Sequence, residues 1–389
     1  MQENMSDLIK ISRRNKIVAY LKEKGKKLGI KRINAAKDAW AANKDEKNFT
    51  ELLNRYSLYP SQGTMLNKKI CLMLPKDSLT YKAALKANSF FKSKIDMIDP
   101  FAEKWSVNKI KEEYDGVIYM PEFKSNYLRQ VSNDHIELLE LFNIPVWPNK
   151  QENYLYESKC RASQYLESLN IPTPKTIVKY TEAGAIECLQ QMDFPFIIKT
   201  NTGASSSGVF LIKNKKEAYK SIRYLFANGF LRQGAYRRDL DYGYIYLQEF
   251  IPDVREYRII KVGENWFGHE KLGKDGSVLY SGSGVNSWEI PSKSVFEFCY
   301  NIAHSNKINV MSFDVFETKC GKLLINELQT WFGSYNPSQM YKDGIPGRFI
   351  KQEDEWRFEE GIFNYNQGLN LRIFEFVRYL NDIEGAGKQ

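Results

Sequence analysis

The segment FDVFETKCGKLLINELQ, residues 313–329, predicts two short apolar strands joined by a turn at Gly321. Asp314 lies in the first strand, and Glu327 and Gln329 lie in the second. Side chains two residues apart on a strand share a face, and hairpin pairing would bring Asp314 beside the other two. Two carboxylates and an amide oxygen are hard ligands that suit Mg²⁺ bridging substrate phosphates. Strands often carry acids on a solvent face as well, so this segment alone leaves both interpretations open.

A Gly/Ser-rich loop upstream favours the phosphate interpretation. Residues 200–208, TNTGASSSG, lie between two predicted strands, the first of which ends at Lys199. A Walker A loop is excluded, because it needs GxxxxGK[ST] followed by a helix. A flexible Gly/Ser loop between antiparallel strands can instead close over phosphates with its N–H groups and hydroxyls, and Lys199 can reach their oxygens. An ordinary hairpin loop remains the alternative for this segment.

Composition indicates a globular protein of two or three domains. The chain has 389 residues, of which 43% are hydrophobic and 14% aromatic. It contains no run of about 18 uncharged apolar residues, and the N-terminus lacks an apolar signal segment, so we expect no membrane span and a cytoplasmic location. The five cysteines are scattered singly, which favours neither a disulfide framework nor a zinc site.

The net charge of +9 comes from one segment. Residues 10–37 contain eleven Lys or Arg and one acid, Glu23, so the rest of the chain sums to about −1. The pattern of residues 1–60 is mostly helical, and this basic extension could face water or dock an acidic partner, an anionic surface or nucleic acid. The basic charge therefore says nothing about the remaining chain.

Residues 70–147 alternate between apolar strands and helices. That order predicts a parallel sheet with helices on its faces, a Rossmann-like module. No GxGxxG follows the first strand, so a dinucleotide site is not indicated.

The order of motifs across residues 145–340 resembles the ATP-grasp superfamily. The resemblance is closest to the branch that includes ribosomal-protein glutamate ligases and D-alanine–D-alanine ligases. The motifs are, in order, Lys159, IPTP at 171–174, FPFIIK with its Gly/Ser loop, YLQEFI at 246–251, EYR at 256–258, and the strands that carry Asp314 and Glu327-Leu328-Gln329.

The resemblance implies a nucleotide held between two lobes. Lys159 and Lys199 would bind its phosphates, main-chain groups of the strand 248–251 would read the adenine, and Glu256 would bind the ribose. The full implied nucleotide-binding set is Lys159, Lys199, Gly203, Ser205, Ser206, Gly208, Gln248, Glu249, Phe250, Ile251 and Glu256.

The resemblance also implies metal, catalytic and substrate residues. The metal ligands for Mg²⁺, or alternatively Mn²⁺, would be Asp314, Glu327 and Gln329; Gln329 departs from the family's usual Asn and leaves the second metal's coordination open. Arg258 and Lys271 would contact the transferred phosphate. Substrate contacts are expected from Ser283, Asn286 and Arg348, the last as a carboxylate anchor.

The expected architecture combines α/β and α+β parts. A basic helical extension (1–60) precedes a Rossmann-like pre-grasp sheet domain (61–150) and a two-lobed ATP-grasp domain (151–350), and a helical tail follows (351–389). The small lobe would span about 172–247 and the large lobe about 248–350. The tail helix 369–380 would pack on the body of the protein or on a second subunit, and the latter would make a homo-oligomer.

The implied activity is that of an ADP-forming, ATP-dependent ligase. A small-molecule carboxylate would become an acyl phosphate, which an amine then attacks to form an amide or peptide bond. A kinase of the same fold, phosphorylating a small molecule or sugar, is the main competing hypothesis. The chain could also bind nucleic acid or a protein partner through residues 10–37, or serve as a scaffold without catalysis.

Overall fold

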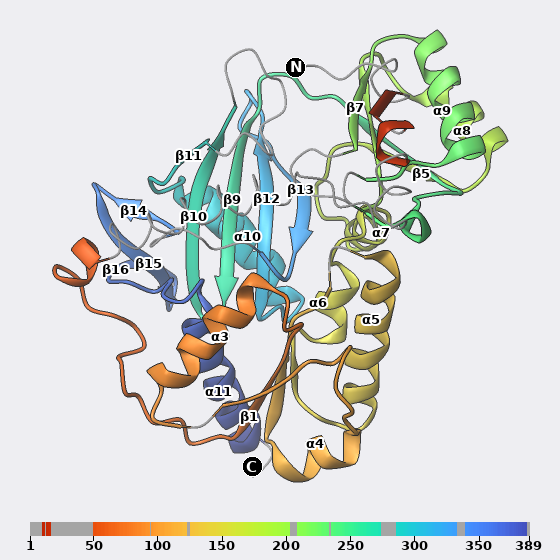
Figure 1. Ribbon diagram of the computed structural model, residues 1–389. Coiled ribbons are helices and arrows are strands. Elements are labelled where there is room, and N and C mark those ends of the chain that lie inside the picture. Colours follow the sequence, from red (N-terminus) through yellow and green to blue (C-terminus); the bar gives the residue numbers. More distant parts are fainter. Residues whose placement is uncertain are drawn as a thin grey trace.

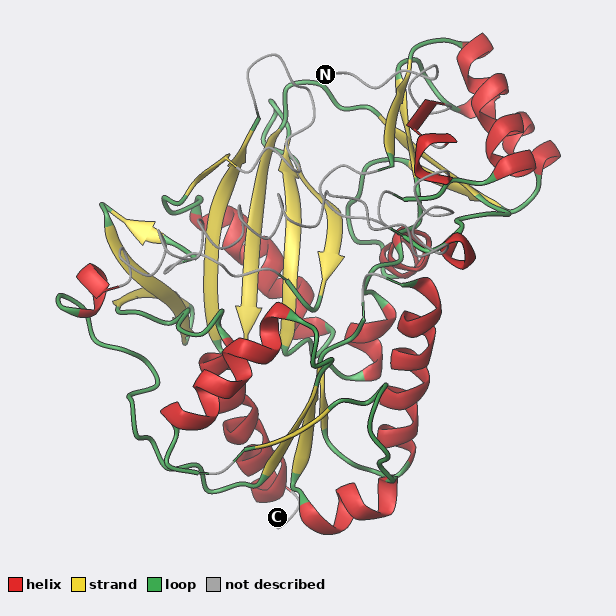
Figure 2. Cartoon of the chain, in the orientation of Figure 1, coloured by secondary structure: helices red, strands yellow, loops and turns green. Residues whose placement is uncertain are grey.

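A computed structural model describes residues 10–11, 13–16, 50–93, 95–122, 125–202, 208–232, 235–273, 285–332 and 339–386. Its strands form a 4-stranded parallel sheet, a 4-stranded antiparallel sheet and an 8-stranded sheet (Figures 1 and 2). This arrangement confirms the predicted mixture of α/β and α+β parts.

The parallel sheet is the predicted Rossmann-like module. Its strand order is β2-β1-β3-β4, with β1 (Ile70–Met73), β2 (Asp96–Ile98), β3 (Gly116–Tyr119) and β4 (Val146–Trp147). The connections contain α3 (Leu79–Phe90), α4 (Val107–Glu113) and α5 (Asn126–Leu141). Every residue of β1 and β3 is buried, as expected for parallel strands covered on both faces.

The small antiparallel sheet carries the Gly/Ser loop. Its order is β5-β8-β6-β7, with β5 (Thr176–Lys179), β6 (Phe196–Lys199), β7 (Val209–Ile212) and β8 (Ile245–Glu249). The helices α8 (Glu182–Glu187) and α9 (Lys215–Asn228) cover one face, where their apolar residues join the core of the sheet. The predicted antiparallel pairing of the two strands around residues 200–208 is confirmed.

The large sheet is built around the stretch 313–329. Its central order is β13-β12-β9-β10, with β9 (Arg255–Val262), β10 (Asn265–Leu272), β12 (Val310–Glu317) and β13 (Leu323–Gln329). The helix α10 (Lys293–Ser305) packs on the face formed by Ile259, Phe313 and Val315. Because side chains alternate along a strand, Arg258 and Asp314 point to the opposite face.

The rest of the large sheet corrects the expectation of a helical tail from residue 351. Strand β10 also pairs with β11 (Val285–Ser287) and with β15 (Ile345–Gln352), which in turn pairs with β14 (Tyr341–Lys342) and β16 (Glu355–Glu360). Trp356 and Phe358 are more buried than Glu355 and Arg357, which is the two-residue alternation of a strand. The prediction missed this short alternation among charged residues.

The C-terminal helix belongs to the parallel sheet. In α11 (Leu369–Ala386), the apolar residues join one core with Ile70, Ile118 and Trp147. They are Leu369, Ile373, Phe376, Val377 and Leu380. The end of the chain therefore returns to the domain that precedes the two lobes (Figure 1).

The described part of the basic extension lies on the small lobe. Ile11 packs against its core, Asn15 donates a hydrogen bond to the carbonyl of Leu231 (2.8 Å), and Lys16 donates to that of Asn228 (2.7 Å). The other residues up to 49 lie outside the described part, so their predicted helices stay a prediction. No helix among the described residues is long and apolar enough to cross a membrane.

Candidate functional site

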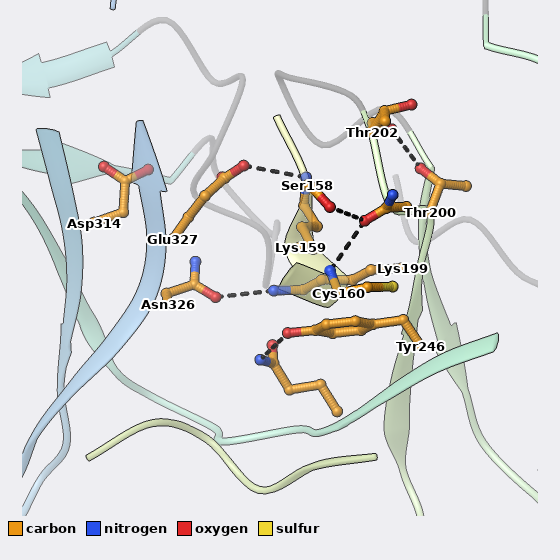
Figure 3. A network of polar contacts seen from close by, with 12 residues as sticks. Ser158, Lys159, Cys160, Lys199, Thr200, Thr202, Tyr246, Asp314, Asn326 and Glu327 are labelled. Carbon is orange, nitrogen blue, oxygen red and sulfur yellow. Dashed lines mark hydrogen bonds and ion pairs between the residues drawn. The ribbon is translucent and has the colours of Figure 1, made fainter. Parts of the chain in front are cut away.

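A pocket lies between the small sheet and the large sheet. It contains about 400 Å³ of space, part of which is open solvent. Its walls come from α7 (Lys159–Ser168), from Tyr246 and Gln248 on β8, and from residues 325–328 of β13. Figure 3 shows Lys159, Lys199, Asn326 and Glu327 close together, and all of these except Lys199 line the pocket.

Lys159 is the first residue of α7, and its position depends on the Gly/Ser loop. The hydroxyl of Ser158 accepts from the N–H of Arg161 and caps the helix. Asn201, from the base of the loop, accepts from the N–H of Cys160 and the hydroxyl of Ser158 (both 3.0 Å), and its carbonyl accepts from the N–H of Lys159. The loop and the lysine helix are therefore joined.

Lys159 and Glu327 form an ion pair across the pocket. Their Nζ and Oε1 atoms lie 3.1 Å apart, with 12% and 19% of the two side chains exposed. Burial lowers the pKa of Lys159, but Glu327 outweighs that effect and the pKa is raised. Burial likewise raises the pKa of Glu327, but Lys159 outweighs it and the pKa is lowered. Both groups are held in their charged forms.

Lys199 lies on β6 and donates a hydrogen bond to Oδ1 of Asn326 (2.8 Å). Asp314 pairs with Glu327 and Val315 with Ile325, so Asn326 is the extra residue of a β-bulge, which re-aims a side chain. Burial lowers the pKa of Lys199 to about 8, although Glu327 opposes the change.

Asp314 is the centre of a buried charge cluster on the face of the large sheet opposite α10. Arg258 binds both of its carboxylate oxygens, at 2.8 and 2.9 Å, and Nζ of Lys271 lies 2.6 Å from Oδ2. Burial favours the neutral acid, but Arg258 and Lys271 outweigh it and hold the pKa of Asp314 well below its usual range. The predicted catalytic pair thus lies directly on the predicted metal ligand.

Glu256 is tied to the same cluster. Its carboxylate accepts from Nζ of Lys271 at 2.7 Å, and its side chain is 2% exposed. Its predicted contact with a ribose therefore stays a prediction, and one that requires this buried pair to rearrange.

The strand predicted to read the adenine, residues 248–251, contains two kinds of residue. Gln248 lines the pocket and donates to the hydroxyls of Thr176 and Tyr246, both at 3.1 Å. Glu249 instead pairs with Lys175: its N–H donates to the carbonyl of Lys175 (2.9 Å), and its carboxylate accepts from that residue's N–H (2.6 Å). The N–H of Glu249 is thus already used, which leaves Phe250 and Ile251, both half-buried, for the predicted main-chain recognition.

The donor set fits a divalent cation shared with phosphates. Asp314 and Glu327 lie directly opposite one another in the register, and Gln329 follows two residues later, opposite Ser312. Among the described residues, no group of three or more His, Cys, Asp or Glu side chains could hold a metal by itself. Mg²⁺ commonly takes one or two carboxylates and completes its shell with phosphates and water, so these residues would hold it together with a nucleotide.

The remaining predicted residues fall into three groups. Gly203, Ser205, Ser206 and Ser283 lie outside the described residues. Gly208 has a φ of +86°, and a Cβ there would collide with Thr200, whose N–H donates to the carbonyl of Gly208. Asn286 lies on β11 directly opposite Lys271, at the edge of the charge cluster.

The predicted carboxylate anchor Arg348 has other contacts. Its guanidinium donates to Glu359 at 2.8 and 3.0 Å and to Asn265, and it stacks on Tyr59 with 4.2 Å between guanidinium carbon and ring centre. Asn265 begins β10, whereas Lys271 lies near its other end. We therefore correct this prediction: Arg348 is satisfied within the fold, away from the charge cluster.

Two site residues were missed by the sequence reasoning. Asn201 lies in TNTGASSSG, two residues after Lys199, but only the fold brings it to α7. Asn326 precedes Glu327, and the pattern of alternating faces places it on the wrong face until the bulge is known.

Comparison with known proteins agrees with this geometry. Residues 156–335 match the family model described as the RimK-like ATP-grasp domain. This segment is a RimK-like ATP-grasp domain. Use of ATP and Mg²⁺ is typical of the family. No curated protein matches the sequence.

Solved structures resemble the ATP-grasp domain and its surroundings. The ADP complex of PurK, an N5-carboxyaminoimidazole ribonucleotide synthetase, is 13% identical with a TM-score of 0.50, and the match covers 82% of this chain and 98% of that one. A RimK-domain ATP-grasp protein from Sphaerobacter thermophilus is 14% identical (TM-score 0.49; 67% and 90% covered). D-alanine–D-alanine ligase from Bacillus anthracis is also 14% identical (TM-score 0.49; 81% and 99% covered).

Proposed function

We propose that this protein is an ATP-dependent, ADP-forming ligase that activates a carboxylate as an acyl phosphate and joins it to an amine. The observation that carries the proposal is the continuous row of charges from Lys159 through Glu327 and Asp314 to Arg258 and Lys271. This row runs from the pocket between the two lobes along the face of the large sheet opposite α10.

The row suits phosphoryl transfer, which needs positioning and charge neutralisation more than a protein nucleophile. Lys159 and Lys199 would hold the phosphates nearest the pocket. Arg258 and Lys271 would bind the transferred phosphoryl group, where the planar guanidinium can contact two of its oxygens. Bound Mg²⁺ would neutralise phosphate charge beside Asp314 and Glu327.

We infer that ion pairs of the nucleotide-free protein exchange partners when Mg²⁺ and nucleotide bind. Asp314 accepts three bonds from Arg258 and Lys271, so cation binding there must compete with these groups. Arg258 and Lys271 could then turn from Asp314 to the anionic phosphates. The exchange keeps each buried charge partnered, which avoids the cost of leaving one alone.

A first experiment tests nucleotide binding. Calorimetry with ATP and Mg²⁺ should show Mg²⁺-dependent binding to the wild type and none to the double variant Lys199→Ala, Glu327→Ala. Arg348→Gln is the matched control, because Arg348 lies away from the pocket, and it should bind normally. Equal binding by the wild type and the double variant would show that the pocket is not the nucleotide site.

A second experiment separates a ligase from a kinase. ADP release should require an acid and an amine together and should yield an amide, and hydroxylamine should trap the acyl phosphate when the amine is omitted. A stable phosphorylated product formed without an amine would support a kinase instead.

The described residues of the basic extension, 10–11 and 13–16, contact the small lobe. We propose that residues 10–37 bind an acidic partner or anionic surface next to the small lobe, against which Asn15 and Lys16 pack. We also propose a cytoplasmic location. Deleting residues 1–37 should abolish salt-dependent binding to such a partner while ATP turnover persists.

A further inference from the structure

The N-terminus of α5, in the domain of the parallel sheet, binds a carboxylate from the segment that precedes β8. Oδ1 of Asp239 accepts hydrogen bonds from the N–H groups of Asn126 (3.0 Å) and Tyr127 (3.4 Å) and from the hydroxyl of Ser125 (3.1 Å). Its other oxygen accepts from the N–H of Tyr236 (3.3 Å), and the residue is 1% exposed. The first N–H groups of a helix lack partners within it, and a negative charge there is favourable.

Neighbouring side chains reinforce this contact between the two parts of the chain. The side-chain amide of Asn126 donates to the carbonyl of Asp239 (3.2 Å), and its oxygen accepts from Arg232 (3.4 Å). The guanidinium of Arg238 lies over the ring of Tyr127, 5.3 Å from its centre. The segment before β8 is therefore fastened to the first turn of α5 by several independent contacts.

Asp241, two residues further on, connects this contact with the base of the Gly/Ser loop. Its Oδ2 accepts from the hydroxyl of Thr202 at 2.9 Å, and its Oδ1 lies 3.5 Å from the side-chain amide nitrogen of Asn126. Its backbone exchanges two hydrogen bonds with Phe230, at 2.8 and 2.9 Å, which hold the carboxylate in place. One carboxylate thus lies between α5 and residues 200–202.

Residues 200–202 carry the connection on to Lys159. Thr202 is fully buried, and its carbonyl accepts from the hydroxyl of Thr200 at 2.8 Å. Between them, the N–H of Asn201 donates to the hydroxyl of Tyr244, and its carbonyl accepts from the N–H of Lys159 at 3.0 Å. An unbroken series of hydrogen bonds therefore leads from the start of α5 to the start of α7.

The charges along this series act on one another as well. Arg129 on α5 is 9% exposed; burial lowers its pKa, while the carboxylates of Glu157 and Asp241 oppose the change. Burial raises the pKa of Asp241, while cations that include Arg129 and Lys159 oppose that change. Asp241 therefore has countercharges on both of the helices that it connects.

We propose that Asp239 and Asp241 are positioning residues for nucleotide binding: they fasten residues 200–202 to the N-terminus of α5, and this segment sets the place of Lys159. The inference rests on the proposed function, in which Lys159 binds nucleotide phosphates. Neither aspartate is among the described residues that line the pocket, so both act through other groups. A small displacement of a binding group is enough to weaken its contacts, which is why their loss reaches the nucleotide.

The first test is hydrogen exchange of the full chain without nucleotide, read for peptides that span the starts of α5 and α7. In Asp241→Ala, the N–H groups of Lys159 and Cys160 should exchange roughly ten-fold faster, because the segment that accepts from them has lost its contact through Thr202. Asp241→Asn keeps an oxygen that can accept from Thr202 and should restore most of the protection.

Asp239→Ala should speed exchange at the start of α5 and also at the start of α7. The control is Glu182→Gln, which changes an exposed carboxylate of α8 in the same lobe and should behave like the wild type. Wild-type exchange at α7 in Asp241→Ala would overturn the proposal, and so would exchange that rises equally throughout the small lobe. A change confined to α5 in Asp239→Ala would remove that residue's positioning role.

The second test compares nucleotides with adenosine. Asp241→Ala should raise the Kd of Mg²⁺-ATP and of Mg²⁺-ADP roughly ten-fold, because both carry phosphates for Lys159. Adenosine, measured by its competition with ATP, carries none and should bind within about two-fold of its wild-type affinity. Asp241→Asn should lie close to the wild type. An equal loss for all three ligands would give Asp241 a purely structural role.

The two tests also separate this inference from the proposed function. If the wild type binds no Mg²⁺-ATP, the proposed function fails, and hydrogen exchange still decides whether Asp241 holds the start of α7. If the wild type binds Mg²⁺-ATP and Asp241→Ala binds it equally well, the proposed function stands and the positioning role is overturned.

Discussion

The ammonium group of Lys199 on β6 lies 2.8 Å from the amide oxygen of Asn326 on β13, so a side-chain hydrogen bond joins two sheets that share no strand. Asn326 lines the pocket in which we propose that nucleotide binds, and Lys199 contacts it from β6. Bound phosphates would offer Lys199 a stronger, charged acceptor than an amide. Asn326 therefore serves as the hydrogen-bond partner of Lys199 while nucleotide is absent.

Replacing Asn326 should affect stability more than nucleotide affinity. Asn326→Ala leaves a half-buried lysine without its acceptor, so the free energy of unfolding in urea should fall by about 1 kcal/mol. The Kd of Mg²⁺-ATP should change by less than about three-fold, whereas Lys199→Ala should weaken it at least ten-fold. Equal losses of affinity in the two variants would show that Asn326 contacts the nucleotide itself.

Nucleotide affinity should fall as pH rises above 8. The pKa of Lys199 is lowered to about 8 in the free protein, mainly by burial, and a bound phosphate would raise it. Binding is thus favoured by the protonated lysine, fully below pH 8, and weakens as pH approaches the higher pKa of the complex. Calorimetry at pH 8.5 in buffers of different ionisation enthalpy should show proton uptake, and Lys199→Ala should remove it.

Asp314 should be essential for stability as well as for Mg²⁺ dependence. Asp314→Asn removes the countercharge of Arg258 and Lys271, so the free energy of unfolding should fall by about 3 kcal/mol. The control is Arg255→Gln, whose ion pair with Glu270 is exposed and should contribute less than about 1 kcal/mol. Similar losses in the two variants would argue against a special role of the buried cluster.

Asn201 should position Lys159 for phosphate binding. Asn201→Ala removes two acceptor contacts at the start of α7 and should cost about 1 kcal/mol of stability, as for a lost helix cap. It should also raise the KM for ATP several-fold with little change in kcat. Ser168→Ala alters an exposed hydroxyl at the other end of α7 and should leave both constants unchanged. A normal KM for Asn201→Ala would show that the contacts of Asn201 do not position Lys159 for ATP binding.

Thiol labelling should report the fold directly. All five cysteines are unpaired, and four of them, Cys71, Cys160, Cys188 and Cys299, are buried. Burial raises the pKa of Cys160 to about 12, whereas hydrogen bonds lower that of the exposed Cys320. One thiol per chain should therefore react quickly in the native protein and all five after denaturation. A second fast thiol without denaturant would contradict the burial of one of the four.

The strands and helices of the parallel sheet could be read from local pattern. The alternation of strands and helices predicted for residues 70–147 is found as β1 to β4 with α3, α4 and α5 between them, because each element is one run of a single periodicity. Strands β5 and β16 were missed, since each is short and partly exposed, and the alternation in β16 covers only a few residues among charged ones. Long-range pairing with β8 and β15 decides their structure.

The sequence by itself determined which residue types were available for the proposed site and the order in which the chain presents them. The spacing within residues 313–329 was enough to predict that Asp314 and Glu327 meet, because strand and hairpin geometry act over a few residues. The order of motifs likewise indicated the ATP-grasp fold that the family match confirms.

Only the tertiary structure decided which charges are partners. Lys159 reaches Glu327, Lys271 reaches Asp314 and Glu256, and Arg348 is taken by Glu359, through contacts that join distant segments. The bulge at Asn326 and the burial of Arg129 and Arg372 are equally invisible in the chain. The physical reason is that an ion pair or a buried charge depends on distance and solvent exclusion in the folded molecule, and neither is encoded by a residue's neighbours along the sequence.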